Sequence, residues 1–103
     1  EVKGPHCIVS NAGSPECNGT YVLNGSRDGV SCYKHTERDM YVLRATVMFV
    51  RAWWISLYKS GPNDTNDYYC NASTGKEPPE IGWALNMYTM GSQPMPQLVF
   101  KKS

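Results

Sequence analysis

The sequence predicts an all-β domain, a small antiparallel sandwich or barrel of about 7–8 short strands. Glycine and proline punctuate the chain at short intervals, and the segments between them are rich in the β-branched and aromatic residues typical of strands. Four cysteines form an even set that suits two disulfide staples, which help a chain of 103 residues to stabilise a modest core. The length suits one domain, residues 1–103, without a linker or internal repeat.

The expected strands are short apolar runs that turn residues separate from one another. In chain order they cover residues 7–10, 19–24, 30–35, 40–50, 52–58, 67–71, 82–88 and 97–101.

The turn between the second and third expected strands has the clearest signal. Asn24-Gly25 and Asp28-Gly29 tolerate the positive φ angles that tight hairpins require. Turn chemistry therefore accounts for these glycines without a ligand.

The run "MYVLRATVMFVRAWWISLY", residues 40–58, is long and apolar enough to suggest a transmembrane helix. Arg44 and Arg51 lie inside it, and each would be costly in lipid. Its β-branched and aromatic content favours two consecutive strands with a bend around residues 50–52. A single helix is the alternative, and we expect no membrane insertion.

The later segment "KEPPEIGWAL" is expected to be structural. Pro78 and Pro79 hold an extended conformation, and Gly82 frees the backbone before Trp83, which belongs in the core.

The cysteines predict an oxidising compartment, because their spacing matches neither a CxxC motif nor a metal site. Four cysteines allow three pairings. We favour Cys7–Cys17, which closes a short loop between neighbouring strands, and Cys32–Cys70.

Four N-x-Ser/Thr sequons support a secreted, N-glycosylated protein. They begin at Asn18, Asn24, Asn63 and Asn71. The chain begins at Glu1 without a signal peptide, as expected of a processed secreted protein or an excised domain.

Strand alternation relates these sequons to the core, because a glycan must point to solvent. If Asn18 and Asn24 face outward, then Tyr21 and Leu23 point inward together with Cys17. By the same argument, if Asn71 faces outward, then Cys70 points inward.

Catalysis has little support in the sequence. The histidines are His6 and His35; the second is expected on the surface, and we assign no catalytic residue. The loop "PNDTND", residues 62–67, offers oxygen ligands but lacks calcium-loop spacing, so we expect no metal and no cofactor. Ten basic residues against nine acidic ones give a net charge of +1, which argues against nucleic acid as a partner.

The aromatic residues are the better candidates for function. Alternation places Trp53, Ile55 and Leu57 in the core, and it places Trp54 and Tyr58 on the other face. Aromatic side chains are frequent interface anchors, so we predict a ligand-binding surface formed by Trp54, Tyr58 and Tyr69. The alternative is that Trp54 lies beneath a loop or a second sheet.

Several short motifs resemble a known family. They are "NGTYV", G-x-x-x-G-V-x-x-Y, "YVLR", "WWIS", "YY" and "PPEIGW", spread over roughly residues 8–99. The pattern resembles an uncharacterised small β-rich module found in larger proteins of protists and marine invertebrates. The resemblance implies one compact β domain and no particular activity.

The function that we predict is a secreted, non-enzymatic, lectin-like binding module that recognises a glycan or an extracellular protein. The alternatives are a structural or assembly component of an extracellular matrix or coat, and a secreted inhibitor or signalling protein.

Overall fold

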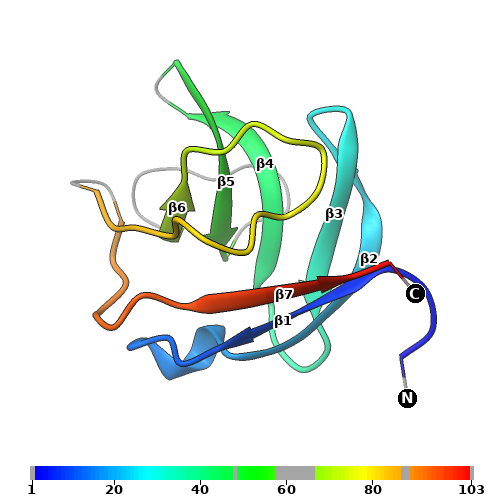
Figure 1. Ribbon diagram of the computed structural model, residues 1–103, viewed down its shortest axis with the longest axis horizontal. Helices are drawn as coiled ribbons and strands as arrows, with labels where there is room; N and C mark the ends of the chain where they lie inside the picture. Colours follow the sequence, from blue (N-terminus) through cyan, green and yellow to red (C-terminus); the bar gives the residue numbers. More distant parts are fainter. Residues whose placement is uncertain (1, 48, 58–66, 87–88, 103) are drawn as a thin grey trace.

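The computed structural model describes residues 2–47, 49–57, 67–86 and 89–102 (Figure 1). The all-β class is confirmed: seven strands and one short 3-10 helix form the fold. In chain order they are β1 (His6–Ser10), η1 (Pro15–Cys17), β2 (Gly19–Arg27), β3 (Val30–His35), β4 (Tyr41–Val47), β5 (Val50–Ser56), β6 (Asp67–Asn71) and β7 (Gln97–Lys101).

All seven strands belong to one antiparallel sheet with the order β6-β5-β4-β3-β2-β1-β7. The first six strands follow one another as a meander, and β7 returns to pair with β1. The sheet curls into a half-barrel (Figure 1), so the two end strands, β6 and β7, come to border its open side.

The long apolar run forms two strands, as predicted, and the register runs from Tyr41 opposite Ser56 to Val47 opposite Val50. The chain therefore reverses between Val47 and Val50 and does not bend around 50–52. Among the described residues, no helix is long and apolar enough to cross a membrane.

Two hydrophobic clusters cover opposite faces of the sheet. The inner cluster joins Tyr69 of β6 to Leu98 of β7, the two ends of the sheet, which is possible because the sheet curls around it. Trp53 and Ile55 belong to this cluster and are fully buried, as predicted. The outer cluster contains Cys32, Tyr41, Leu43, Ala45, Ala52 and Trp54. Strand β5 is therefore buried on both faces.

The predicted disulfides, Cys7–Cys17 and Cys32–Cys70, are wrong, because none of the four cysteines forms a disulfide. Cys7 and Cys17 are buried in the inner cluster, and burial raises the pKa of both thiols, that of Cys17 to about 12. The Cys32 thiol donates to the carbonyl oxygen of Asn24 at 3.0 Å. Buried thiols of this kind pack as small hydrophobic side chains.

In the described part of the expected strand 82–88, residues 82–86, the β structure is one bridge, in which Ala84 and Cys70 exchange two backbone hydrogen bonds of 3.0 and 2.8 Å. Residues 89–92 then continue along β6. The amide of Met90 donates to Asp67, and that of Gly91 donates to Tyr68. These irregular segments cover part of the β6 edge. Trp83, predicted to be a core residue, is 5% exposed.

Candidate functional site

Two of the three residues predicted to form an exposed aromatic binding surface, Trp54 and Tyr69, are buried. Trp54 is only 3% exposed, and its indole nitrogen donates to the carbonyl oxygen of Ala45 at 3.0 Å. Tyr69 is fully buried; its hydroxyl donates to the Ser92 carbonyl at 2.7 Å and accepts from the Ser14 amide at 3.0 Å. Trp54 is a packing residue because the outer face of the sheet is also covered, and Tyr69 packs in the inner cluster. Tyr58 lies outside the described residues.

The sequon at Asn71 is also buried, against the expectation that it faces solvent. The register of β6 places Asn71 opposite Trp53 on the inner face and Cys70 opposite Trp54 on the outer face. The Asn71 side-chain nitrogen donates to the carbonyl oxygen of Ile81 at 2.8 Å, and the residue is 4% exposed. A glycan attached to that nitrogen is incompatible with this packing.

The other sequons lie in different surroundings. The side-chain oxygen of Asn18 accepts from the amide of Ala12 at 2.9 Å, and both Asn18 and Asn24 are half-buried. Asn63 lies outside the described residues. Tyr21 points inward as predicted, but Leu23 is 48% exposed because it lies beyond the inner cluster.

His35 is a structural residue and is only 3% exposed, against the expectation of a surface position. One ring nitrogen, Nδ1, accepts from the amide of Glu37 at 3.0 Å, so the other, Nε2, donates to the carbonyl oxygen of Asn18 at 2.8 Å. Its ring also packs edge-to-face against Tyr21, with centroids 5.1 Å apart. Among the described residues, no group of three or more histidine, cysteine or acidic side chains is placed to hold a metal.

The most exposed aromatic residue described is Phe49, at the tip of the β4–β5 hairpin. Its side chain is fully solvated, with a relative exposure of 101%, and its neighbour Val50 is 56% exposed. The hairpin tip projects from the end of the sheet (Figure 1). The backbone of Phe49 has φ +68°, a left-handed conformation that is unusual for any residue except glycine, asparagine and aspartate.

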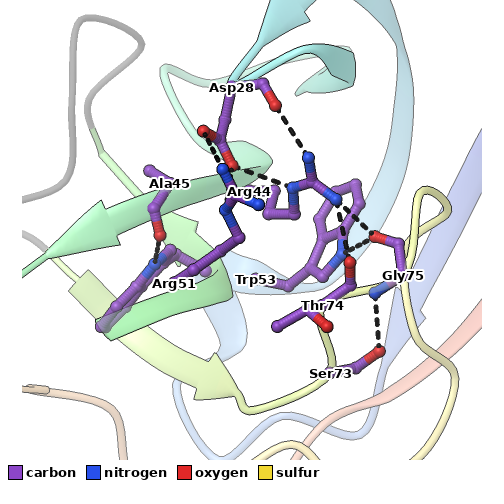
Figure 2. A network of polar contacts seen from close by, with 9 residues as sticks. Asp28, Arg44, Ala45, Arg51, Trp53, Ser73, Thr74 and Gly75 are labelled. Carbon is purple, nitrogen blue, oxygen red and sulfur yellow. Dashed lines mark hydrogen bonds and ion pairs between the residues drawn. The ribbon is translucent and has the colours of Figure 1, made fainter. Parts of the chain in front are cut away.

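A polar network holds the base of this hairpin (Figure 2). In the β2–β3 turn, Asp28 also has a positive φ of 57°. Its carboxylate accepts from Arg44 of β4 at 2.9 Å and lies 3.1 Å from Arg51 of β5, while its carbonyl oxygen accepts from Arg44 at 2.8 Å. Both strands of the hairpin are therefore tied to the neighbouring turn.

The same network reaches the loop after β6. The Arg44 guanidinium donates to the carbonyl oxygens of Thr74 at 2.9 Å and Gly75 at 3.3 Å, and the indole of Trp53 donates to Gly75 at 2.9 Å (Figure 2). Arg44 is only 8% exposed, and a guanidinium with this many fitted acceptors is held rigidly. The hairpin consequently rises from a fixed base.

Comparison of the chain with protein-family models, with curated proteins and with solved structures found no match.

Sequence reasoning missed Phe49 because the hairpin lacks the Asn-Gly or Asp-Gly pair that marks a two-residue turn. The sequence held one weak signal for a turn: in the run "TVMFVR", a β-branched valine flanks residues 48–49 on each side. Arg44 and Arg51 gave a stronger signal, since two charges inside an apolar run require partners.

Proposed function

We propose that this protein is a binding module that recognises another protein through the tip of its β4–β5 hairpin, with Phe49 as the anchoring side chain. One observation carries the proposal. A large aromatic side chain is fully solvated on a backbone conformation that costs about 1–2 kcal/mol for such a residue.

Neither the solvated ring of Phe49 nor its left-handed backbone conformation stabilises the fold. Burial of an aromatic side chain ordinarily contributes to stability, and Phe49 is not buried. A turn residue at positive φ is ordinarily glycine or asparagine. Both departures from the usual pattern are explained if the side chain is buried in a partner.

The chemistry of the tip favours a protein partner. Phenylalanine has no polar group that would hydrogen-bond to a sugar, whereas buried aromatic anchors dominate protein interfaces. Attachment to a membrane requires a larger apolar face together with free basic residues. Here Arg51 is paired with Asp28, and the exposed apolar residues described at the tip are Phe49 and Val50.

The proposal also treats the module as non-enzymatic and secreted. His35 uses both ring nitrogens on backbone groups, which supports a structural role for it. Secretion stays a prediction: the sequons at Asn18, Asn24 and Asn63 still support it, whereas the buried sequon at Asn71 and the disulfide argument no longer do.

Photo-crosslinking tests the site directly. A photoreactive phenylalanine analogue at position 49 is expected to give a discrete protein adduct in the cells or fluid that contain the protein. The same analogue at Ile81, which is 86% exposed, is the matched control and is expected to give none. Equal labelling from both positions, or adducts with lipid alone, would contradict the proposal.

A further inference from the structure

A second feature lies away from the hairpin tip: a groove of about 380 Å³ between β3, the end of β7 and the loop after β6. Its floor is formed by Val30, Tyr33 and Phe100, and its rim carries Lys76, Glu77 and Lys102. Small-ligand sites have volumes of roughly 300–1,000 Å³ and combine an apolar lining with a few polar groups, and this groove matches that description.

The floor is aromatic. Tyr33 and Phe100 pack edge-to-face, with ring centroids 5.9 Å apart and an interplanar angle of 73°. Tyr33 is 3% exposed and Val30 is 8% exposed, so they form the floor from below, while Phe100 is half-buried and keeps part of its ring open to solvent. A ligand with an apolar face can therefore cover Phe100.

The rim is polar and carries a net positive charge, since two lysines stand against one glutamate. The Lys102 ammonium lies 3.7 Å from the Glu77 carboxylate, but the two side chains are 80% and 56% exposed. An ion pair this exposed holds its partners weakly, so Lys102 is able to turn toward a ligand. Lys76 adds a second cation to the groove lining.

The walls of the groove are held in place before any ligand arrives. Arg44 ties the β2–β3 turn at Asp28 to the loop at Thr74, and these two segments lead directly into the two sides of the groove. Outside the groove lining, the Glu80 carboxylate accepts from the amide of Phe100 at 2.8 Å and holds this end of β7. Fixed walls reduce the entropy cost of binding.

We propose that this groove binds a carboxylate-bearing sugar. The ring would lie with its apolar face on Phe100, its hydroxyls would donate to Glu77, and its carboxylate would pair with Lys76 and Lys102. The inference does not depend on the proposed role of Phe49, which does not line the groove.

Titration of the whole protein with matched sugars, followed by amide NMR, tests the ligand class. Glucuronic and galacturonic acid are compared with glucose and galactose, which carry a hydroxymethyl group in place of the carboxylate. With a uronic acid we expect saturable amide shifts at Tyr33, Lys76 and Phe100. The affinity of the matching neutral sugar, obtained from the same shifts, is expected to be at least fivefold weaker. No shifts with either acid, equal affinity for acid and neutral sugar, or equal affinity for acetate would overturn the proposal.

Lysine variants test the site itself. Lys76→Gln and Lys102→Gln are each expected to weaken uronic-acid binding at least threefold. Lys101→Gln is the matched control, because it removes the same charge from β7 outside the groove lining. If uronic-acid binding weakened equally in all three variants, the effect would come from general charge attraction. That result would contradict the proposed binding site. Phe49→Gly is expected to leave sugar binding unchanged, which separates this proposal from the hairpin proposal.

Discussion

Arg44 is the single residue on which most of the architecture around both proposed sites depends. From β4, its guanidinium donates fitted hydrogen bonds to two segments that are distant in sequence, the β2–β3 turn and the loop after β6 (Figure 2). Its side chain is 10% exposed, whereas that of Arg51, which shares the Asp28 carboxylate, is 52% exposed. The two arginines that share the Asp28 carboxylate are therefore expected to differ greatly in their contribution to the free energy of unfolding.

Replacing Arg44 tests this difference. Arg44→Met keeps the aliphatic stem but removes all four hydrogen bonds of the buried guanidinium, so we expect a loss of about 2–4 kcal/mol in the free energy of unfolding. Arg51→Met is expected to cost less than about 1 kcal/mol because its ion pair is exposed to solvent. Urea denaturation measures both, and equal losses would contradict the assignment.

The buried thiols predict a specific dependence on pH. Burial raises the pKa of Cys17 from 9.0 to about 12 in the folded protein. Above pH 9 the unfolded thiol ionises while the folded thiol stays protonated, so stability that is complete below pH 9 is lost as the pH rises toward 12.

The measurement is the free energy of unfolding as a function of pH. In the alkaline range this free energy should fall by up to about 1.4 kcal/mol per pH unit for each such thiol. Cys17→Ala is expected to be less stable at neutral pH but to show a shallower alkaline slope. An alkaline slope identical to that of the wild type would show that this thiol is not responsible.

At the scale of elements, the irregular segment 89–92 acts as an edge strip for β6. Beyond its backbone bonds to β6, the amide of Ser92 donates to the Ser14 hydroxyl at 3.0 Å, which joins the strip to the loop after β1. Gly91 lies so close to β6 that a Cβ atom there would collide with the Tyr68 carbonyl and the Tyr69 ring. The strip depends on that close approach.

Gly91→Ala is therefore expected to destabilise the protein by at least about 2 kcal/mol, as overpacking does. Gly75→Ala is the control, because a Cβ atom at that position would meet only the Ser73 hydroxyl at 3.7 Å. Its effect should stay within about 0.5 kcal/mol. Thermal unfolding of the two variants distinguishes them, and similar melting temperatures would refute the role given to the strip.

Most elements were predictable from local pattern, and the failures have physical causes. The strands at Val30–His35, Asp67–Asn71 and Gln97–Lys101 match their predicted bounds, since β-branched and aromatic runs between turn residues define them. Alternation also placed Trp53 correctly. It failed for Trp54 because a period of two separates the faces but does not say whether the second face is covered.

The candidate sites were harder to predict than the strands. The groove brings β3, β7 and a loop together, and the order of strands in a curled sheet is not encoded in any local pattern. Phe49 depends on a two-residue reversal without the usual turn residues. Disulfides were predicted from the number and spacing of the cysteines, which do not reveal that three of the thiols are buried and that none of the four forms a disulfide.

At the scale of the whole molecule, the curled sheet makes a compact body from which one apolar tip projects. The radius of gyration is 12.0 Å, close to the value of about 13 Å expected for a compact domain of 100 residues. Stability comes from the two clusters and the polar network, and the described tip residues, Phe49 and Val50, belong to none of them. The tip can therefore be altered without loss of the fold.

Phe49→Gly is accordingly expected to raise the free energy of unfolding by about 0.5–1 kcal/mol. Relief of the left-handed strain exceeds the entropy cost of a glycine in the unfolded chain. Alanine also has a Cβ atom, so Phe49→Ala keeps the left-handed strain and should give no such gain in stability. Urea denaturation of the pair checks this, and a marked loss of stability in Phe49→Gly would mean that the ring packs on the protein itself.

The central claim, that Phe49 anchors a protein partner, is tested most directly by one affinity. The measurement is the Kd of the partner captured by crosslinking at position 49, determined for the wild type and for Phe49→Gly. A hot-spot side chain contributes about 2 kcal/mol or more, so we predict binding at least about 30-fold weaker for the variant. An unchanged Kd in a folded Phe49→Gly variant would contradict the claim.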